Sequence, residues 1–367
     1  MKYLFITGPL NAGGAERVLL DVLRNFDYTQ HEVHLCQIVA GGHLVHEVSK
    51  QVKQLQLWPA YTLSYKLANH LSNKLGIGHF VRLRMKQVLT EEYDIAISFL
   101  EGTPLKFHAI GMPRAKRHYS WVHCDLYNFP YEKGQFRNEK EELNAYNAMD
   151  AVICVAKDTE RAFQKRFPSC KSAVRTIYNP VDLDKVQRMS NACTIENKEF
   201  TVLCLGRISP PKKIDRVVRV AALLKKKGLP IHFQIMGQGE IKSEIEHQIA
   251  DCDVQDRVVI KPFQANPFPY VKAADVLLSS SVAEGFSLVI CEAMALGIPV
   301  VSTRTAGPVE ILQDKYGLLC EHDDESIAAA VELMYLNAEL RCNYAQSALS
   351  RVQDFAVENT MKQIYAL

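Results

Sequence analysis

Two segments of this 367-residue chain repeat the order strand, glycine-containing loop and helix, and this order constrains the fold more than any other feature. In the first segment, an apolar run over residues 2–7 leads through a loop over 8–14 into a stretch over 15–26 with helical periodicity. The second segment has a strand over 200–205, a loop over 206–213 and a helix over 214–227. Strands that alternate with helices are typical of parallel sheets with right-handed crossovers. The sequence therefore predicts an α/β fold.

Further short apolar runs between helical stretches predict the remaining strands. They lie over 31–39, 93–99, 151–155, 175–178, 231–236, 258–260, 275–279 and 299–302. Between residues 181 and 199 the sequence is polar and has no clear period, so the link between two doubly wound domains is predicted there. Ligands of such sheets bind at the carboxyl ends of the strands. The site is therefore expected in a cleft between the two halves.

The composition excludes several classes of protein. Hydrophobic residues make up 48% of the chain and charged residues 23%, which argues against intrinsic disorder. No pair of the ten cysteines has CxxC spacing, so a zinc ribbon is not expected and a reducing compartment is the simplest interpretation. No segment reaches ~18 uncharged apolar residues, and the first apolar run is too short for a signal peptide. These observations predict a cytoplasmic protein without a membrane-spanning helix.

The formal net charge of +2 is unevenly distributed along the chain. Residues 48–90 contain no Asp or Glu but seven Lys and Arg side chains, interleaved with leucines and aromatic residues. An ordinary solvated helix and a surface that binds anionic lipid are both compatible with this composition. Nucleic-acid binding is not expected, because the chain has neither a matching motif nor an overall basic balance.

The strongest chemical signal is the segment from Glu284 to Glu292. Its pattern predicts a turn over 285–287 and a helix over 288–296, closed by Gly297. The backbone N–H groups of such a turn and of the helix N-terminus can face an anion or a polar sugar. A carboxylate accepts hydrogen bonds from sugar hydroxyls, and one inside an apolar helix needs a partner. A plain helix with one exposed Glu and one first-turn Glu is the alternative.

Three weaker signals accompany this segment. Arg207 and Lys212 in the second glycine loop can neutralise a diphosphate leaving group, although a cationic surface loop has the same composition. Gly13 and Gly14 in the first loop let the backbone approach a ligand, with an ordinary turn as the alternative. Their spacing is not GxGxxG, which counts against a nicotinamide site. His123 follows an apolar run and is either a core histidine or a site residue.

The segment from Glu284 to Glu292 resembles the EX7E signature of retaining glycosyltransferase family 4, whose members have the GT-B fold. The resemblance continues through Glu-Ala-Met-Ala-x-Gly-x-Pro-Val-Val to Gly307-Pro308 and Glu310-Ile311. It covers the second half of the chain more fully than the first.

In fold, this resemblance implies two Rossmann-like, doubly wound domains that face each other across a cleft. We expect an acceptor-side domain over residues 1–183 and a nucleotide-sugar-binding domain over 184–349. A C-terminal helix of about 350–367 is expected to pack back on the first domain.

The resemblance also implies a role for each candidate site residue. Glu284 would contact the donor sugar, and Glu292 would bind the nucleotide ribose. Arg207 and Lys212 would bind the phosphates, and His123 would contact the donor sugar. The other residues implied to line the donor site are Gly13, Gly14, Gly285, Phe286, Ser287 and Leu288, with Pro262 and Phe263 around the base.

Two positions depart from the family pattern. Lys213 stands where the family usually has glycine, and Ser287 stands where it often has glycine or proline. The second departure leaves the preferred donor sugar open.

The implied reaction transfers a hexose or N-acetylhexosamine, with retention, from a nucleotide sugar to a glycan or lipid-linked acceptor in cell-surface polysaccharide or glycoconjugate synthesis. UDP is the preferred nucleotide. Neither a cofactor nor a metal is expected, because the DxD letter matches at 182–184 and 251–253 do not follow buried strands. Many relatives act on lipid-linked acceptors, which favours peripheral association of residues 48–90 with the cytoplasmic face of an anionic membrane. The alternatives are a sugar-nucleotide epimerase or hydrolase, a non-catalytic sugar-nucleotide-binding subunit and a nicotinamide-dependent oxidoreductase.

Overall fold

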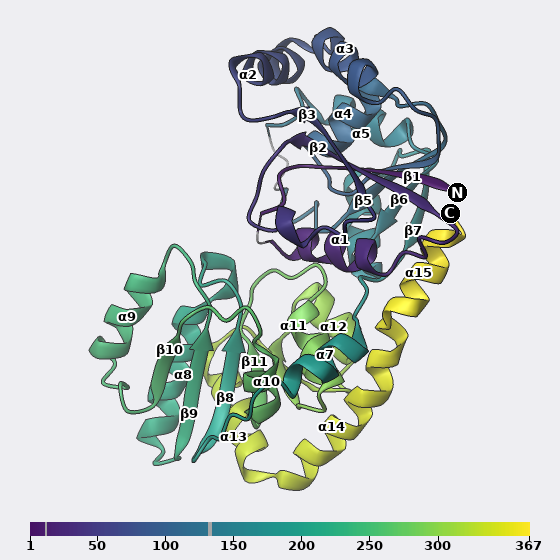
Figure 1. The fold of residues 1–367 in the computed structure, drawn as a ribbon. Coiled ribbons are helices and arrows are strands. Elements are labelled where there is room, and N and C mark those ends of the chain that lie inside the picture. The colour runs from purple at the N-terminus through teal and green to yellow at the C-terminus, as the bar shows by residue number, and fades with distance from the viewer. Residues whose placement is uncertain (12, 131–133) are drawn as a thin grey trace. The chain divides into compact units, whose positions relative to one another are not determined.

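The computed structural model describes residues 1–11, 13–130 and 134–367, and these form two compact units (Figure 1). Unit 1 comprises Met1–Pro180 together with Val357–Leu367, and unit 2 comprises Val181–Ala356. The chain thus leaves unit 1 after Pro180 and returns to it at Val357. The sequence placed these two boundaries after residues 183 and 349.

Unit 1 is built on a seven-stranded parallel sheet with the order β3-β2-β1-β4-β5-β6-β7. Its strands are β1 Lys2–Thr7, β2 Glu32–Val39, β3 Lys53–Trp58, β4 Tyr93–Ser98, β5 Ala115–Val122, β6 Ala151–Cys154 and β7 Ala173–Thr176. Its helices are α1 Gly14–Arg24, α2 Leu63–His70, α3 His79–Val88, α4 Thr103–Gly111, α5 Glu139–Asn147, α6 Lys157–Arg166 and α15 Val357–Tyr365, with the 3-10 turn η1 Val45–Glu47 and the π-helical turn η2 Leu71–Leu75.

The core of unit 1 explains why its apolar runs become strands. Leu4 and Ile6 of β1 are fully buried, because helices cover both faces of a parallel sheet. The helical periodicity predicted for α1 is confirmed, since Val18, Leu19 and Val22 form its buried face.

Two strands of unit 1, β3 and β5, were not predicted from the sequence. β3 lies at the sheet edge, and only Leu57 and Trp58 at its end are buried, so its sequence KQLQLW looks polar. β5 begins with the polar sequence AKRH, and only its second half is buried. Edge position and a polar beginning both weaken the apolar signal on which strand prediction depends.

Unit 2 is built on a six-stranded parallel sheet with the order β10-β9-β8-β11-β12-β13. Its strands are β8 Phe200–Leu205, β9 Ile231–Met236, β10 Val258–Lys261, β11 Val276–Ser279, β12 Val300–Thr303 and β13 Leu318–Cys320. Its helices are α7 Leu183–Ser190, α8 Ile214–Lys226, α9 Lys242–Asp251, α10 Phe268–Ala273, α11 Leu288–Ala295, α12 Ala306–Leu312, α13 Asp324–Leu336 and α14 Ala338–Arg351, with the 3-10 turns η3 Pro210–Lys212 and η4 Val352–Phe355. The predicted α/β fold with two Rossmann-like parallel sheets is confirmed.

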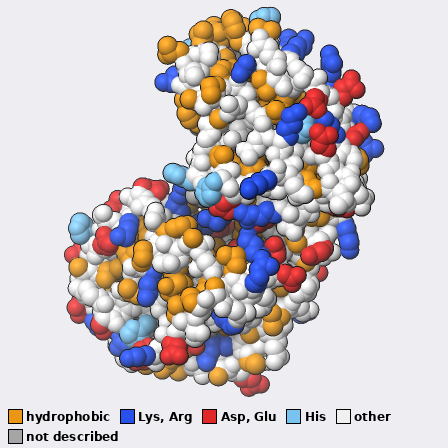
Figure 2. Space-filling view, viewed as in Figure 1, with side chains coloured by type: hydrophobic (Ala, Val, Ile, Leu, Met, Phe, Trp, Pro, Cys, Tyr) orange, Lys and Arg blue, Asp and Glu red, His pale blue; other side chains and the backbone are white. Residues whose placement is uncertain are grey.

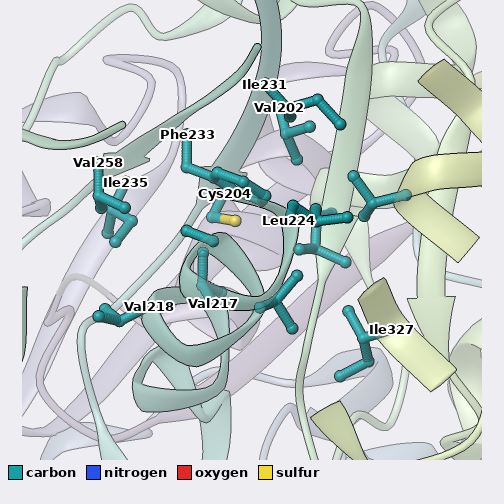
Figure 3. Packing of buried hydrophobic residues seen from close by; sticks show 14 of the residues in the cluster. Val202, Cys204, Val217, Val218, Leu224, Ile231, Phe233, Ile235, Val258 and Ile327 are labelled. Carbon is teal, nitrogen blue, oxygen red and sulfur yellow. The ribbon is translucent and has the colours of Figure 1, made fainter. Parts of the chain in front are cut away.

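The core of unit 2 lies between its sheet and the helices α8 and α13. Figure 3 shows the buried residues Val202, Cys204, Ile231, Phe233, Ile235 and Val258 of the sheet, Val217, Val218 and Leu224 of α8, and Ile327 of α13. Close packing of these side chains fixes α8 on the sheet, and thereby fixes the loop over 206–213 that precedes it.

The segment 181–199, where the domain link was predicted from its weak pattern, contains helix α7 over Leu183–Ser190. Val186 on its inner face is buried, and Gln187 Nε2 donates a hydrogen bond to the carbonyl oxygen of Ala295 on α11 at 2.7 Å. Two helical turns are too short for hydrophobic periodicity to be recognised.

Both sheets reverse their strand order once. The reversal lies between β8 and β11 in unit 2 and between β1 and β4 in unit 1. The loops that follow two such strands lead to opposite faces of the sheet and leave a crevice at their carboxyl ends, where ligands of open α/β sheets bind. Each unit therefore has one favoured place for a ligand.

A buried pair of histidines makes the stability of unit 1 sensitive to acid. His108 on α4 is fully buried, and its Nε2 lies 3.0 Å from Nδ1 of His118 on β5. Burial lowers the pKa of His108 from 6.5 to about 3, and it also lowers the pKa of His118. The unfolded chain therefore binds protons between pH 6.5 and 3 that the folded chain excludes. Stability is fully present above pH 6.5 and falls as the pH falls through this window.

We expect the folded state to lose roughly 2–3 kcal/mol of stability through His108 as the pH falls from 7 to 4.5. The measurement is the melting temperature at pH 7 and pH 4.5. The His108→Gln variant should show a smaller drop than the wild type, and the variant of the exposed His43, His43→Gln, should show the wild-type drop. An equal drop in wild type and His108→Gln would refute the assignment.

Candidate functional site

A pocket lies at the strand-order reversal of unit 2, where β8 and β11 end. Among the residues that line it are Gly206, Arg207, Lys212, Ser281, Glu284 and Ser287. The structure thus brings together three of the four predicted catalytic residues, from the loops after β8 and β11. Helix α8 and helix α11 follow these loops and hold them in place.

Glu284 is the central side chain of this pocket. Its Oε1 forms an ion pair with Nζ of Lys212, and the two side chains are 15% and 30% exposed. Ser281 Oγ donates a further hydrogen bond to the same oxygen at 3.4 Å, and the backbone N–H of Gly307 donates to the Glu284 carbonyl oxygen at 3.1 Å. Within residues 1–11, 13–130 and 134–367, Oε2 accepts no hydrogen bond. One carboxylate oxygen is therefore held by protein, and the other can accept from a ligand hydroxyl.

The loop that carries Lys212 is bound to the loop after β11. Ser280 Oγ donates to the carbonyl oxygens of Lys212 and Lys213 at 2.9 and 3.1 Å, and the N–H of Val282 donates to the Pro211 carbonyl oxygen at 2.9 Å. These hydrogen bonds fix Lys212 beside Glu284. Lys213 has a φ of 51°, a left-handed conformation that glycine adopts without steric cost. This geometry explains why glycine suits the position that Lys213 occupies.

Arg207 supplies the second cation of the pocket. Its side chain is exposed, and it has no ion pair or side-chain hydrogen bond in the described part of the chain. A guanidinium group without a carboxylate partner can bind phosphate oxygens in a bidentate manner. The pocket therefore contains one cation paired with Glu284 and one available for an anion.

Two glycines that sequence analysis missed support the Arg207 loop from behind. Gly237 has a φ of 157°, and a Cβ atom there would lie 1.8 Å from the carbonyl oxygen of Gly206. A Cβ atom at Gly239 would lie 1.9 Å from the carbonyl oxygen of Ile208. Any larger residue at either position would displace the loop backbone that carries Arg207. The signal was the sequence Gly-Gln-Gly directly after a predicted strand.

The turn after Glu284 presents backbone rather than side chains. The Phe286 ring packs on Phe355 in a T-shaped contact at 5.3 Å and is 9% exposed, so its side chain belongs to the core. Ser287 precedes α11 as its N-cap, and Leu288 is the first residue of that helix. A Cβ atom at Gly307 would lie 2.8 Å from the Gly285 carbonyl oxygen, so α12 packs closely against this turn. The approach of this backbone to a diphosphate stays a prediction.

Of the nine residues predicted to bind the donor beside the catalytic ones, only Ser287 lines the pocket at β8 and β11. Glu292 is half-buried in the middle of α11 and does not line this pocket. Pro262 and Phe263 follow β10, and Phe263 is 48% exposed. The N–H of Gly237 donates to the Lys261 carbonyl oxygen at 3.5 Å, so the end of β10 lies next to the loop after β9. The ribose role of Glu292 and the base-binding role of Pro262 and Phe263 stay predictions.

His123 follows β5 in unit 1, and its hydrogen bonds define its tautomer. Its Nε2 lies 2.9 Å from the carbonyl oxygen of Phe99, which can only accept, so Nε2 carries the proton. Burial lowers the pKa of His123, so the ring is neutral at pH 7 and Nδ1 is an acceptor. The backbone N–H of His123 donates to Oε2 of Glu101 at 3.2 Å. A neutral ring whose Nδ1 can accept a hydrogen bond suits a sugar hydroxyl, and the predicted contact with the donor sugar stays a prediction.

The first glycine loop leads into α1 as predicted. Gly13 is the N-cap of α1 and Gly14 its first residue, while Ala12 lies outside the described residues. A Cβ atom at Gly13 would lie 2.2 Å from Oε2 of Glu16, so the Glu16 carboxylate lies over this glycine. A larger residue at position 13 would displace that carboxylate. The predicted role of the two glycines beside the phosphates stays a prediction.

The two DxD segments have structural roles. Asp182 caps α7 by accepting a hydrogen bond from the Lys185 N–H at 2.8 Å. Asp251 ends α9, and Asp253 is an exposed side chain that forms an ion pair with Lys225 at 3.4 Å. Helix capping therefore accounts for Asp182, and surface pairing for Asp253.

No described helix is both long and apolar enough to span a bilayer.

Two family models match the chain. The model for glycosyl transferases group 1 matches residues 186–351, and the model for glycosyltransferase family 4 matches residues 12–185. Together they cover both units, including the pocket at β8 and β11. The chain belongs to glycosyltransferase family 4. The predicted family and the predicted enzyme class are therefore confirmed.

Named relatives of this glycosyltransferase are found in bacteria. A Haemophilus influenzae protein named uncharacterized glycosyltransferase is 23% identical, over 98% of this chain and 97% of its own. A Campylobacter jejuni enzyme named GalNAc-α-(1→4)-GalNAc-α-(1→3)-diNAcBac-PP-undecaprenol α-1,4-N-acetyl-D-galactosaminyltransferase is 26% identical, over 99% of this chain and 97% of its own. A Staphylococcus aureus poly(ribitol-phosphate) α-N-acetylglucosaminyltransferase is 29% identical, over 82% of this chain and 60% of its own.

Solved structures show the same fold. The crystal structure of Anabaena Alr3699/HepE in complex with UDP superposes with a TM-score of 0.79 at 21% identity, over 100% of this glycosyltransferase and 99% of that chain. Sucrose-phosphate synthase from Thermosynechococcus elongatus superposes with a TM-score of 0.75 at 19% identity, over 100% and 98% of the two chains. The Anabaena protein also has a crystal structure in complex with UDP-glucose. These likenesses confirm the GT-B fold.

Proposed function

We propose that this glycosyltransferase moves a hexose or N-acetylhexosamine from a UDP-sugar to a glycan or lipid-linked acceptor, with retention at the anomeric carbon. The observation that carries the proposal is the pocket at β8 and β11, which contains the Lys212–Glu284 ion pair and Arg207, a cation with no ion pair among the described residues. Two cations suit a diphosphate, and a carboxylate with one free oxygen suits a sugar hydroxyl. The pocket thus matches both parts of a nucleotide sugar.

The chemical step follows from the charges in this pocket. The acceptor oxygen forms a bond to the anomeric carbon as the bond from that carbon to the β-phosphate oxygen breaks. The electron pair of the broken bond stays on the diphosphate, and the acceptor proton moves to a diphosphate oxygen. Arg207 and Lys212 stabilise the negative charge that develops there. Attack from the face that the diphosphate leaves retains the anomeric configuration.

The names of the relatives support the substrate classes. The Anabaena structures contain UDP or UDP-glucose, and the Campylobacter jejuni and Staphylococcus aureus enzymes are named N-acetylhexosaminyltransferases. The acceptors in those two names are a diphospho-undecaprenol glycan and poly(ribitol-phosphate). We therefore assign the protein to cell-surface polysaccharide or glycoconjugate synthesis.

A donor panel tests this proposal. Thermal shifts with UDP, GDP, UDP-glucose, UDP-N-acetylglucosamine and UDP-N-acetylgalactosamine should show the largest stabilisation with UDP and one of its sugars. An assay without acceptor should release free sugar or an epimer only slowly compared with transfer to an added glycan. Rapid hydrolysis or epimerisation with no transfer product would favour an epimerase or hydrolase instead.

We also propose that the protein acts at the cytoplasmic face of the membrane and binds it through one surface of unit 1. This α2–α3 surface carries six exposed large apolar side chains, which are Leu63, Leu67, Leu75, Ile77, Phe80 and Leu83. The exposed lysines Lys66, Lys74 and Lys86 lie among them and have no ion pair in the described chain. Figure 2 shows hydrophobic and basic side chains gathered over α2 and α3. Apolar and cationic groups together are typical of proteins bound at an anionic lipid surface.

Three of the four remaining basic residues of the 48–90 window, all except Lys50, add less to this surface than the sequence suggested. Lys53 lies on β3 and pairs with Glu91 at 2.5 Å. Arg84 donates from Nε to the Leu57 carbonyl oxygen, and Arg82 donates from Nε to the Ile110 carbonyl oxygen at 3.1 Å. Backbone and carboxylate partners hold these three side chains.

Binding to anionic liposomes tests the contribution of the three lysines. Each lysine near an anionic bilayer contributes about 1 kcal/mol, so Lys66→Glu, Lys74→Glu and Lys86→Glu together should weaken binding to phosphatidylglycerol vesicles by at least ~100-fold at low salt. The matched control replaces the exposed Lys116, Lys140 and Lys171 of the same unit by Glu. Co-sedimentation measures the bound fraction, and wild-type protein that stays in the supernatant would end the proposal.

A further inference from the structure

Unit 1 contains a second pocket, separate from the pocket at β8 and β11 of unit 2. It lies at the strand-order reversal between β1 and β4. The loops after β1 and β4, the end of β2 and the starts of α1, α2 and α4 contribute to its walls. Its polar and aromatic lining includes Asn11, Glu16, Tyr61, Tyr65 and Glu101. None of the thirteen residues predicted for the site lines it.

Hydrogen bonds between loops keep this pocket open without a ligand. The N–H of Leu10 donates to the Gly41 carbonyl oxygen, and the N–H of Leu44 donates to the Leu10 carbonyl oxygen, both at 2.9 Å. On the opposite wall, Gln135 Oε1 accepts from the N–H and the Oγ1 of Thr103 at 2.6 and 2.7 Å. Walls fixed in this way lose little conformational entropy when a ligand binds.

Glu101 gives the pocket a carboxylate in a fixed orientation. Its Oε2 accepts the backbone N–H of His123 at 3.2 Å, and its Oε1 accepts from Cys124 Sγ at 2.9 Å. A carboxylate has about four acceptor positions, so about two remain for ligand hydroxyls. The Glu16 carboxylate lies over Gly13 at the N-terminus of α1 and lines the same pocket. The pocket thus offers acceptors from two sides.

Two tyrosines give the pocket an aromatic wall. The Tyr61 ring is 59% exposed and meets the Tyr65 ring edge to face at 5.4 Å. Tyr65 in turn contacts Trp58 at 5.5 Å, which anchors both rings to the end of β3. Exposed aromatic faces can pack on the C–H face of a pyranose, while carboxylates accept its hydroxyl protons.

The charges of the side chains that line the pocket restrict which ligands it can bind. The ionisable side chains among the described lining residues are carboxylates and tyrosines, and none is a Lys, Arg or His. An anionic group in the pocket would face Glu16 and Glu101 with no cation from this lining to balance it. Like charges brought together in a partly buried site cost several kcal/mol.

We infer that this pocket binds an uncharged sugar residue at the end of the acceptor and discriminates against a uronic acid or a phosphorylated sugar. Glu101 and Glu16 accept its hydroxyl protons, and Tyr61 packs on its ring. The role of this sugar as the acceptor rests on the proposed function, whereas sugar binding by the pocket does not. Tyr61 and Tyr65 adjoin Leu63 and Leu67 of the α2–α3 surface, so a lipid-linked sugar could occupy the pocket while its lipid stays at the membrane.

Saturation-transfer NMR with methyl α-glucoside, methyl N-acetyl-α-glucosaminide and methyl α-glucuronide tests the inference on the whole protein with UDP present. We expect both neutral glycosides to bind at least fivefold more tightly than the glucuronide. The Tyr61→Ala variant should bind the neutral glycosides at least fivefold more weakly. The Glu101→Gln variant should show an at least fivefold smaller preference for neutral over acidic sugar. Glu92→Gln, an exposed carboxylate just before β4 at its opposite end, is the matched control and should behave as wild type.

Three outcomes would overturn the inference. First, the wild type could bind the glucuronide as tightly as the glucoside. Second, it could bind no glycoside at all. Third, the Tyr61→Ala and Glu101→Gln variants could both bind the glucoside as tightly as the wild type does. Because Tyr61 is exposed, its replacement leaves the fold intact even if Glu101→Gln does not. UDP binding, measured on the same samples, reports separately on the proposed function.

Discussion

The Glu284→Gln variant is expected to lose at least about 100-fold of its transfer rate and to bind free UDP more tightly than the wild type. Loss of one charged hydrogen-bonding group that acts on the transition state reduces the rate of an enzyme by about 10²–10³-fold. The gain in UDP affinity has a different cause. In the ligand-free protein Glu284 is the ion-pair partner of Lys212, so it competes with the diphosphate for that cation. Glutamine removes the competing charge and keeps the shape.

Calorimetric titration with UDP and an initial-rate assay measure the two effects on the same preparation. We expect a three- to tenfold lower Kd for UDP, which corresponds to about 0.7–1.4 kcal/mol. The matched control is Glu246→Gln, because Glu246 pairs with Lys242 at 2.8 Å on the surface of the same unit. It should leave rate and affinity unchanged. Wild-type transfer by Glu284→Gln would refute its role in the reaction, and unchanged UDP affinity would refute the competition for Lys212.

The Lys106→Met variant is expected to lose about 3–5 kcal/mol of folding free energy. Lys106 on α4 is 1% exposed, and its Nζ donates at 3.0 Å to the carbonyl oxygens of Ser72 and Gln135 and to Oδ1 of Asn73. Glu141 Oε1 lies 3.6 Å from the same nitrogen. Methionine fills similar space but leaves these buried acceptors and the carboxylate without their cation. The melting temperature of unit 1 should fall by about 10 °C.

The Lys106→Met substitution should also destabilise the structure locally. Ser72 and Asn73 belong to η2, so Lys106 holds the end of the α2 segment on the body of unit 1. Amide hydrogen exchange in residues 63–75 should therefore accelerate in Lys106→Met. The matched control is Lys116→Met, whose lysine is 79% exposed and pairs with Asp94, and which should change stability by less than about 0.5 kcal/mol. Equal melting temperatures for Lys106→Met and the wild type would contradict this account.

The pocket at β8 and β11 could be predicted from sequence because its residues follow buried strands. Arg207 and Lys212 come directly after β8, and Glu284 follows β11, which is its neighbour in the sheet. The carboxyl ends of neighbouring parallel strands meet at one edge, so an apolar run followed by a charged loop places its charges there. The Lys212–Glu284 ion pair itself could not be predicted, because it depends on which side chains reach each other across two loops.

The second pocket could not be predicted in the same way. Tyr61 and Tyr65 follow the edge strand β3, which its polar sequence concealed, and Glu101 carries no motif. Gly237 and Gly239 were also missed, since a glycine in a loop shows its role only when the neighbouring backbone is in place. Likewise, Lys106 looks like any surface lysine in sequence. Long-range contacts, rather than local pattern, determine these features.

The most direct measurement of the central claim is the affinity of the Arg207→Ala variant for UDP. Arg207 is exposed and has no ion pair in the described chain, so its removal should leave the melting temperature of the ligand-free protein within about 1 °C of wild type. A charged hydrogen bond to phosphate contributes about 1.5–3 kcal/mol. The account predicts at least about tenfold weaker UDP binding by calorimetry. Wild-type affinity in Arg207→Ala, or no UDP binding by the wild type, would contradict it.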